Sequence, residues 1–329
     1  MSAKLISKLE AIVSKDLRTD EPMSKHSHYG IGGPAKYFVV AQTAEEIVEL
    51  VRLAIEFKLD WVAIGAGTNI LVNDAGFDGL VIKMAHRSIQ IDSESGEVVV
   101  ESGALSAMVA RETAKNGLTG LEWAIGLPGT IGGAVRGNAG CFGGETKEYL
   151  ESVEIVNGET GEVEEIPAKK LRMGYRESAV KHNPWIVLRA HFKLEKRDAE
   201  RNMEKIEDVL QCRARTQPKN ARCAGCSFKN FEYEDEDELA QLFKVMGREA
   251  IPPQFLDDKI IPAGWLIDKA ELKGFHIDGA SISEVHGNFV VNDGNATADH
   301  VAQLLATVKM KVRDKYGIQL QEEIQYIGF

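Results

Sequence analysis

A glycine-rich segment of twenty residues, 126–145, is the feature that most limits how this chain can fold. It reads GLPGTIGGAVRGNAGCFGGE and holds eight of the chain's 31 glycines. Apolar side chains are interleaved with the glycines, which favours a folded loop over a flexible surface linker. Because glycine has no Cβ and permits positive φ, neighbouring amide N–H groups can turn together toward a phosphate chain or a flat ring. The segment therefore predicts a cradle for a cofactor.

A second glycine loop, Gly65-Ala66-Gly67, follows a short apolar run that predicts a buried strand. It begins like the dinucleotide fingerprint G-x-G-x-x-G, but Ile70 stands at the third glycine position. The residues that follow predict a turn and a strand at 80–83, not the helix whose N-terminus would receive a pyrophosphate. The pattern argues against a Rossmann site. It favours a diphosphate held by loop amides, with Thr68 and Asn69 as side-chain donors.

Length and charge set the class of protein. A chain of 329 residues is long enough for two or three domains. Its 39 Lys and Arg residues against 50 Asp and Glu give a net charge of −11, which disfavours nucleic acid and anionic membranes as partners. Residues 1–15 predict an amphipathic helix and no signal peptide, and no apolar run approaches membrane-spanning length. Four cysteines fit a reducing cytosol, so we expect a cytoplasmic monomer.

The hydrophobic pattern predicts mixed helices and strands and no internal repeat. Helices are expected from residue 43 or 44 to 58 and at 105–115, 199–215 and 299–316, with Gly317 ending the last one. Strands are expected at 36–40, 97–101, 153–156, 163–166 and 185–194. Residues 318–329 alternate like one exposed edge strand. The mixture, with its hairpin turns, indicates an α+β architecture.

Two basic features suit an anionic ligand. Arg176 lies in GYRES, just ahead of a predicted strand, where its planar fork can hold a carboxylate. Residues 213–230 carry five cations, including Arg215 and Lys219, and no acidic residue. Such a stretch is typical of a pocket rim for a diphosphate or carboxylate, but ordinary surface arginines and lysines explain both features equally simply.

Two further short patterns were weighed. Cys223-x-x-Cys226 invites a zinc or redox interpretation, but no second pair, no nearby histidine pair and no thioredoxin-like context accompanies it. We therefore expect no metal. Glu322 and Glu323 fall on opposite faces of the predicted last strand. A solvated strand explains them without a catalytic role.

Taken in order, the motifs resemble those of the UDP-N-acetylenolpyruvoylglucosamine reductases (the MurB family), flavoenzymes of bacterial peptidoglycan precursor synthesis. The resemblance spans about residues 28–328 and rests on IGGPAKYFV, IGAGTNILVNDAGFDGLVI, LEWAIGLPGTIGGAVRGNAGCFGGE, GYRES, AGCSFKN, AGWLIDKAELKG and EEIQYIG. It implies an α+β protein with a two-part FAD-binding unit of the vanillyl-alcohol-oxidase (PCMH) type and a C-terminal α+β substrate domain. The implied divisions are FAD-binding subdomains at 1–84 and 85–200, the substrate domain at 201–310, and a segment at 311–329 that returns to the flavin domains.

The resemblance also implies roles for particular residues. Arg176 would stabilise an anionic intermediate, Cys226 would be the proton donor in place of the commoner serine, and Glu323 would be the motif's catalytic carboxylate. The implied cofactor-binding residues are Tyr29, Gly65, Ala66, Gly67, Thr68, Asn69, Ile70, Pro128, Gly129, Thr130, Gly132, Gly133, Asn138 and Gly140. The implied substrate-binding residues are Tyr175, Arg215, Lys219, Ser227, Asn230 and His286.

The implied reaction uses non-covalent FAD and NADPH as co-substrate. NADPH reduces the flavin and leaves, the enolpyruvyl sugar nucleotide takes its place, and hydride passes from flavin N5 to C3 while a proton reaches C2. No long insert follows Arg176, so the chain resembles the shorter type, which lacks a tyrosine-bearing loop. Two alternatives remain open: a flavin-dependent alcohol or aldonolactone oxidase of the same fold, and a non-catalytic nucleotide-sugar-binding protein.

Overall fold

The computed structural model describes residues 2–13 and 17–329, and the chain divides into two compact units. Unit 1 consists of Met1–Glu21, Pro34–Gly67 and Phe77–Arg215. Unit 2 consists of Pro22–Gly33, Thr68–Gly76 and Thr216–Phe329. The chain therefore enters unit 2 twice before its C-terminal third, and the loop of residues 65–70 crosses from one unit to the other.

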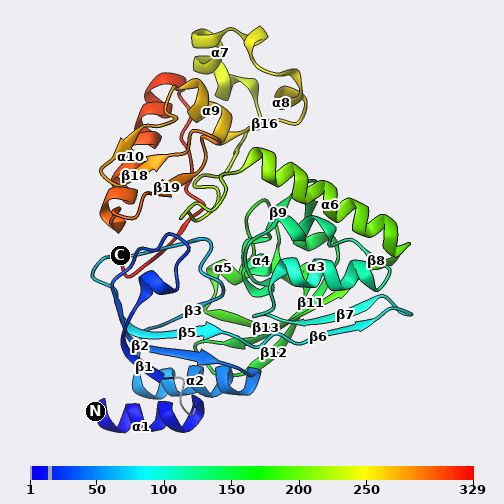
Figure 1. Cartoon of the computed structure of the whole chain (residues 1–329), viewed down its shortest axis with the longest axis vertical. Coiled ribbons are helices and arrows are strands. Elements are labelled where there is room, and N and C mark those ends of the chain that lie inside the picture. The colour runs from blue at the N-terminus through cyan, green and yellow to red at the C-terminus, as the bar shows by residue number, and fades with distance from the viewer. Residues whose placement is uncertain (1, 14–16) are drawn as a thin grey trace. The chain divides into compact units, whose positions relative to one another are not determined.

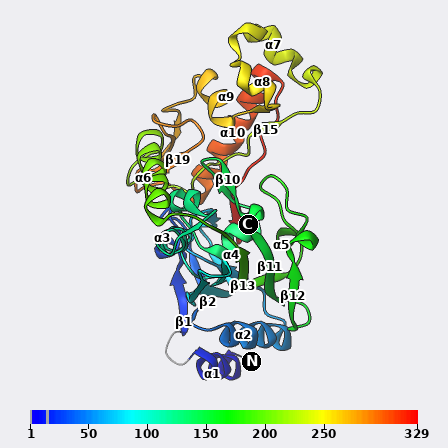
Figure 2. The ribbon, with the colours of Figure 1, turned by 90° about the vertical axis from the view of Figure 1, so that its right-hand side faces the viewer.

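Unit 1 begins with a four-stranded sheet covered by two helices. Its elements are α1 (Ser2–Val13), β1 (Leu17–Pro22), β2 (Pro34–Ala41), α2 (Ala44–Phe57), β3 (Trp61–Ile64) and β5 (Phe77–Met84). The strand order is β1-β2-β5-β3, and β5 pairs in parallel with both β2 and β3. The apolar faces of α1 and α2 share a core with β2 and β5, and the two helices lie side by side in Figures 1 and 2.

A second, antiparallel sheet fills the rest of unit 1. Its strands are β6 (Ile89–Asp92), β7 (Glu97–Glu101), β11 (Leu150–Asn157), β12 (Val163–Pro167) and β13 (Trp185–Lys193), in the order β12-β11-β13-β7-β6. The helices of this part are α3 (Ser106–Lys115), α4 (Ile131–Gly137), α5 (Ala179–His182) and α6 (Ala199–Thr216). Short pairs join β8 (Leu118–Thr119) to β14 (Glu195–Lys196) and β9 (Gly140–Cys141) to β10 (Gly144–Glu145). The glycine-rich segment thus belongs to the core of this sheet.

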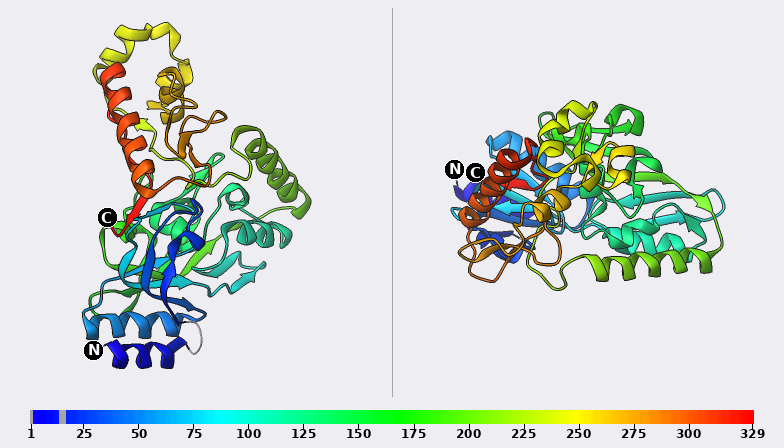
Figure 3. Two further views of the ribbon diagram at one scale, coloured as in Figure 1. Left: turned by 60° about the vertical axis from the view of Figure 1, so that its left-hand side comes forward. Right: turned by 90° about the horizontal axis from the view of Figure 1, so that it is seen from above.

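Unit 2 has smaller sheets and one long helix. Its elements are β4 (Ile70–Val72), β15 (Phe231–Glu232), α7 (Ala240–Met246), α8 (Pro253–Asp257), β16 (Ile260–Ile261), α9 (Ala263–Lys269), β17 (His276–Ile277), β18 (Ala280–Ile282), β19 (Val290–Asn292), α10 (Ala298–Tyr316) and β20 (Gln325–Ile327). Helix α10 packs against β17 and β18 of the antiparallel sheet β17-β18-β19, as Figure 3 shows. Tyr29, Ile31 and Leu71 complete the core from the two early segments.

The predicted α+β architecture and the long helices are confirmed. Thr43 caps α2 by accepting the Glu46 N–H at 3.1 Å, and Gly317 ends α10 with φ of 75°. The predicted hairpin is β11 with β12. Helix α1 covers Ser2–Val13, and the rest of the predicted helix, Met1 and residues 14–15, lies outside the described residues. In the part of the chain described, no helix has both the length and the apolar character needed to cross a bilayer.

The prediction of one strand over residues 318–329 is wrong. Only Gln325–Ile327 forms a strand, β20, which pairs in parallel with β4. Just before it, Glu322 pairs with Phe228 in an isolated antiparallel bridge. The residues alternate as expected, but the pairing partner changes within the segment, which ends the regular ladder.

A buried histidine, His86, lies behind the glycine-rich segment in unit 1. It is 2% exposed, and its Nε2 lies 3.0 Å from the Leu188 carbonyl oxygen and 3.3 Å from Ser102 Oγ. The Ser102 carbonyl in turn accepts the Gly132 N–H at 2.8 Å. Burial lowers the pKa of His86 below its ordinary value, so the ring is neutral near pH 7.

We expect acid to destabilise the protein through His86. As pH falls below about 6.5, the unfolded chain takes up a proton before the folded His86 does, so stability falls, by at most about 1.4 kcal/mol per pH unit for one proton. His86→Gln keeps a donor for the Leu188 carbonyl but cannot titrate. Denaturant unfolding between pH 5 and pH 8 should therefore show a shallower acid slope for His86→Gln, and parallel curves for both proteins would refute this role.

Candidate functional site

The glycine-rich segment comes close to other groups, as predicted, but many of these groups belong to the protein itself. A Cβ at Gly132 would lie 2.9 Å from Ser102 Cβ, and one at Gly144 would overlap the Trp123 ring. The segment is also not a loop throughout, because residues 131–137 form helix α4. The amides of Ile131 and Gly132 donate to the carbonyls of residues 104 and 102. These glycines are needed for packing inside unit 1.

The two predicted glycine loops meet in unit 1. A Cβ at Gly65 would overlap Thr130 Oγ1, so the loop that follows β3 lies directly against the start of α4. Gly67 has φ of 73°, a left-handed conformation that glycine adopts without strain. Gly65, Gly67 and Thr130 were all predicted to bind the cofactor, and the structure places the first and last of them in contact.

Two glycines of α4 have room beside them. A Cβ at Gly133 would meet only Thr130 Oγ1, at an ordinary 3.7 Å, and a Cβ at Gly137 would meet nothing within 4 Å of the described chain. Neither residue has positive φ. Helix interiors normally favour alanine over glycine by about 0.5–1 kcal/mol. Packing within unit 1 therefore does not explain glycine at these two positions, whereas a ligand lying over Gly133 would.

Arg176 lies at the tip of a tight turn in unit 1. Gly174 and Glu177 exchange main-chain hydrogen bonds at 3.0 and 3.2 Å, which leaves Tyr175 and Arg176 at the tip. Arg176 itself has a left-handed backbone with φ of 54°. The guanidinium lies over the Tyr175 ring, 5.4 Å from its centroid. The turn thus presents two side chains that were predicted to act on the substrate.

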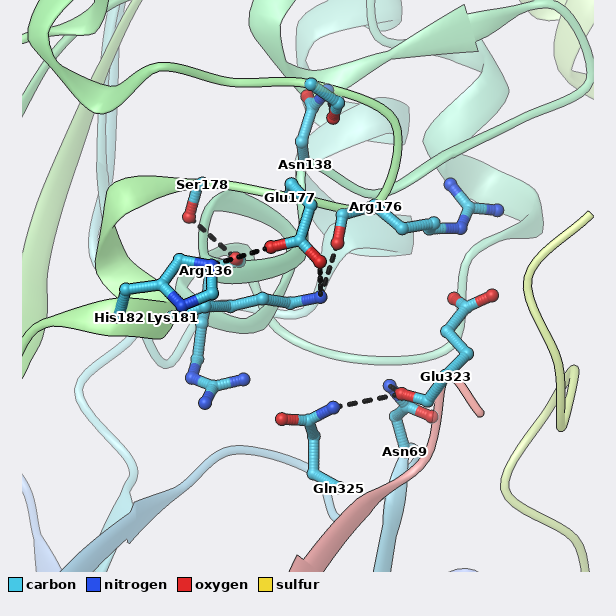
Figure 4. Close-up of polar contacts among 11 residues, drawn as sticks. Asn69, Arg136, Asn138, Arg176, Glu177, Ser178, Lys181, His182, Glu323 and Gln325 are labelled. Atoms are coloured by element: carbon cyan, nitrogen blue, oxygen red, sulfur yellow. Dashed lines mark hydrogen bonds and ion pairs between the residues drawn. The ribbon is translucent and has the colours of Figure 1, made fainter. Parts of the chain in front are cut away.

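Contacts from α4 and α5 hold this turn, as Figure 4 shows. The Asn138 amide donates to the Gly174 carbonyl at 2.8 Å, and the Ser178 hydroxyl donates to the Arg136 carbonyl at 2.7 Å. Lys181 donates to the Arg176 carbonyl and lies 3.7 Å from the Glu177 carboxylate. Asn138 is fully buried, and its second amide hydrogen goes to Glu145. Its side chain therefore positions the turn, and its predicted contact with a cofactor remains a prediction.

In unit 2, the segment that carries Cys226 pairs with two partners. Cys226 forms an antiparallel bridge with Phe289, and Phe228 forms one with Glu322. The Glu323 N–H donates to the Ser227 carbonyl at 2.8 Å. Cys226 is partly exposed, whereas Ser227 is fully buried. The structure thus brings the chain at Cys226 and Ser227 next to Glu323 across nearly one hundred residues of sequence.

Side-chain amides fix the other side of Glu323. Its carbonyl oxygen accepts the Asn69 amide at 3.1 Å and the Gln325 amide at 3.0 Å, as drawn in Figure 4. The neighbouring Glu322 is not a freely solvated side chain, because Lys309 Nζ lies 2.7 Å from one of its oxygens and the Tyr326 hydroxyl donates to the other. Burial and the Glu322 carboxylate raise the pKa of Tyr326.

Several predicted residues of unit 2 have structural roles. Tyr29 is fully buried, and burial raises the pKa of its hydroxyl, which lies near Ser227. Asn230 Oδ1 accepts the Ala263 N–H at 3.2 Å, at the start of α9. His286 accepts the Asn288 N–H at Nδ1, so its ring proton is on Nε2. Burial and Lys273 lower the pKa of His286, which keeps the ring neutral near pH 7.

The predicted basic stretch does not form one cluster of contacts. Arg213 donates to the Gly126 carbonyl within unit 1, and Arg215, also in unit 1, is exposed. Lys219 is exposed in unit 2. Arg176 belongs to unit 1, whereas Cys226 and Glu323 belong to unit 2.

Sequence reasoning missed the residues that position the predicted ones. Lys181 supports the Arg176 turn, Lys309 pairs with Glu322, and Asn288 contacts both Phe228 and His286. Only Lys181 has a local signal, since it follows Glu177 at a helical i,i+4 spacing. Nothing in the sequence links Lys309 or Asn288 to their partners.

Comparison with known proteins gives a consistent result. Residues 35–167 match the family described as FAD binding domain, and residues 217–327 match the C-terminal domain of UDP-N-acetylenolpyruvoylglucosamine reductase. The reductase of that name from Caldanaerobacter subterraneus is 33% identical, over 100% of this chain and 99% of the relative. The one from Bacillus subtilis is 33% identical, over 99% of this chain and 98% of the relative. The crystal structure of UDP-N-acetylenolpyruvylglucosamine reductase (MurB) from Thermus caldophilus superimposes with a TM-score of 0.72 at 32% identity, covering 94% of this chain and 99% of that one.

The two open glycines provide a matched test of the cradle. Gly133→Ala should keep or raise the thermal stability of the apoprotein, because alanine favours α4 and meets no clash, but it should weaken flavin binding about tenfold or more. Gly137→Ala is the control with identical chemistry in the same helix and should bind flavin normally. Fluorescence titration of apoprotein with FAD measures both. Equal affinity in the two variants would remove Gly133 from the cradle, and Gly132→Val is a poorer probe because it clashes with Ser102.

Proposed function

The chain belongs to the UDP-N-acetylenolpyruvoylglucosamine reductase (MurB) family of FAD-binding oxidoreductases in peptidoglycan precursor synthesis, and we propose that it uses NADPH to reduce the enolpyruvyl group of UDP-N-acetylglucosamine enolpyruvate to UDP-N-acetylmuramate. Relatives of the same name match over nearly their whole length and over nearly all of this chain. That agreement in length supports the complete reaction of the family and not only its flavin-binding half.

The proposed FAD site includes the two glycine loops, with the flavin held non-covalently. The residues fit such a group, because Gly65 lies against Thr130 and the Gly133 side of α4 leaves space that a Cβ would fill. Bound FAD supplies the hydride for the enolpyruvyl C3 after NADPH has reduced it. The protein's own contribution there is shape: glycines let the main chain approach a planar ring and a diphosphate closely.

Cys226 is the proposed donor of the proton that reaches C2. A thiol with an ordinary pKa of about 8.5 carries its proton at pH 7, so it can act as a general acid. Two observations favour Cys226 over its neighbour Ser227: Cys226 is partly exposed and can meet a substrate, whereas Ser227 has no exposed surface. This difference is the observation that carries the assignment.

Glu323 is the proposed carboxyl group beside the developing anion. Its main chain is held on one side by Ser227 and on the other by the Asn69 amide, so its position follows that of the Cys226 segment. Negative charge grows at C2 and spreads into the substrate carboxylate as hydride is added at C3. A protonated Glu323 stabilises that charge, whereas an ionised one would oppose it.

Arg176 is the proposed partner of the substrate carboxylate. Its planar guanidinium can bind both oxygens of a carboxylate, and a preorganised cation of this kind stabilises extra charge as it develops. The left-handed turn and its ties to Asn138 and Lys181 hold the Arg176 main chain in one place before substrate arrives. Little of the binding energy is then spent on ordering the turn.

The remaining substrate contacts are proposed by position. Neutral His286 has its Nε2 proton available as a hydrogen-bond donor to a sugar or phosphate oxygen. Tyr175 lies next to Arg176 at the tip of the turn, and Asn230 lies at the start of α9. Exposed Arg215 and Lys219 suit the diphosphate of the UDP group.

The setting of the reaction is also proposed. The chain fits the shorter type of the family, since only the four-residue helix α5 stands between the Arg176 turn and β13. We propose the domain division 1–84, 85–200, 201–310 and 311–329 for the two flavin subdomains, the substrate domain and the returning segment. NADPH and a UDP-sugar are nucleotides of the cytoplasm, which supports action there, and we propose a monomer.

Cys226→Ala tests the proton donor. Reduction of the flavin by NADPH should stay near normal, while oxidation of the reduced flavin by the enolpyruvyl substrate should slow by about 10²-fold or more. Anaerobic stopped-flow absorbance separates the two steps. Cys226→Ser should keep much of the rate because a hydroxyl also donates a proton. Ser227→Ala is the control and should be mild. A large defect there, or normal turnover in Cys226→Ala, would contradict the assignment.

Glu323→Gln and Glu322→Gln separate catalysis from stability. Glu323→Gln should lower kcat and kcat/KM together, because the interaction is made mainly with the developing charge. Glu322→Gln weakens the pair with Lys309 and should cost about 0.5–1 kcal/mol of stability with little change in kcat. Steady-state kinetics and thermal unfolding of both variants check this. Equally mild kinetics at the two positions would leave Glu323 without a catalytic role.

A further inference from the structure

A buried asparagine, Asn288, is paired with the main chain next to Cys226. Asn288 Oδ1 accepts the Phe228 N–H at 2.9 Å, and Nδ2 donates to the Phe228 carbonyl at 2.8 Å. The Asn288 carbonyl also accepts the Ser227 N–H at 2.8 Å. Three hydrogen bonds from one residue, which is 3% exposed, therefore hold the two residues that follow Cys226.

The same asparagine also fixes His286. Its N–H donates to His286 Nδ1 at 3.1 Å, which places the ring proton on Nε2. Phe289 packs edge-on against the imidazole, with ring centroids 4.9 Å apart, and pairs with Cys226 in the bridge. Asn288 is thus the one residue between a main chain that leads to Cys226 and a ring proposed to contact substrate.

We propose that Asn288 is a positioning residue that sets the place of the Cys226 thiol relative to His286. This inference rests on the proposed function, because it assigns Asn288 no contact with substrate and lets it act through Cys226. A carboxamide suits the role, since its planar group carries one acceptor and a donor side and can satisfy both the N–H and the C=O of one peptide residue. Alanine would leave both Phe228 groups buried without these partners, and the segment would shift to find new ones.

A shift of about 1 Å in a reacting group is enough to cost about 10²-fold in rate. The expected effect of losing Asn288 is therefore on proton delivery and not on the reduction of flavin by NADPH. Because the effect passes through Cys226, it should disappear in a protein that already lacks the thiol. A purely structural role predicts the opposite, namely that the two losses multiply.

Asn292 provides a matched control. It is 7% exposed, and its side chain also makes three hydrogen bonds to main chain: to the Tyr29 carbonyl at 2.8 Å and from the N–H groups of Gly294 and Ala296 at 2.7 and 3.0 Å. None of these three partners is in the Cys226 segment or is His286. Asn292→Ala should therefore lower thermal stability about as much as Asn288→Ala without the same defect in proton delivery.

The experiment is a double-mutant cycle on the flavin-loaded, full-length protein. Asn288→Ala, Asn292→Ala, Cys226→Ala and the double variant Asn288→Ala with Cys226→Ala are reduced anaerobically and mixed with the enolpyruvyl substrate, and the rate of flavin oxidation is recorded. We expect Asn288→Ala to slow this step at least tenfold with near-normal reduction by NADPH. We expect the double variant to be no slower than Cys226→Ala alone.

Asn288→Asp is the second variant in case the alanine variant does not fold. A neutral carboxylic acid carries one donor and one acceptor, as the amide does, whereas a carboxylate cannot donate to the Phe228 carbonyl. Flavin oxidation in Asn288→Asp should therefore recover as pH falls, relative to the wild-type profile. A flat ratio of the two profiles would overturn the proposal.

The outcomes separate this inference from the proposed function. Normal flavin oxidation in Cys226→Ala alone would remove the proton donor, and the role of Asn288 with it. A slow Cys226→Ala variant combined with a multiplicative effect of Asn288→Ala would leave the proposed function standing and overturn the positioning role. The same holds if Asn292→Ala slows flavin oxidation as much as Asn288→Ala does.

Discussion

Main-chain hydrogen bonds hold residues 321–327 between two segments that come much earlier in the sequence, and unit 2 depends on them. On one side, residues 227 and 229 pair with residues 323 and 321. On the other side, residues 69–73 pair with residues 325–327, partly as the parallel ladder of β4 and β20. Every group that these bonds satisfy would otherwise be a buried polar atom at a cost of about 1–3 kcal/mol. Glu323 therefore has a fixed place although it is only six residues from the chain end.

The glycines of residues 126–145 divide into two kinds, and the division explains why one segment serves both packing and binding. Gly132 and Gly144 are required because Ser102 and Trp123 occupy the space of a side chain. Gly133 and Gly137 have no such neighbour, so only something outside the described chain can explain them. Composition reports the number of glycines but does not distinguish the two kinds. Only the coordinates show which ones face the protein and which ones face a ligand.

Local signals predicted most of the fold and few of the contacts within the site. The Thr43 cap and Gly317 mark helix ends by chemistry that lies within a few residues, so α2 and α10 were predictable. The C-terminal strand was not, because the alternation of residues 318–329 says nothing about where the pairing partner changes. The ion pair of Glu322 with Lys309 was likewise hidden, since it depends on how α10 packs against the residues that follow it. The three proposed catalytic residues came from motif order, and their supporting contacts came only from the structure.

The asparagines show how a motif can be interpreted too narrowly. Sequence reasoning assigned Asn69, Asn138 and Asn230 to ligands, yet each one also bonds the main chain of a functional segment: Glu323, Gly174 and the start of α9. Asn288 does the same for the chain beside Cys226 without contacting any group assigned from the sequence except His286. An asparagine side chain carries the same donor and acceptor as a peptide group, so it can replace a neighbouring strand where none is available. In this protein an asparagine within a functional motif is thus as much a sign of how the site is positioned as of what it binds.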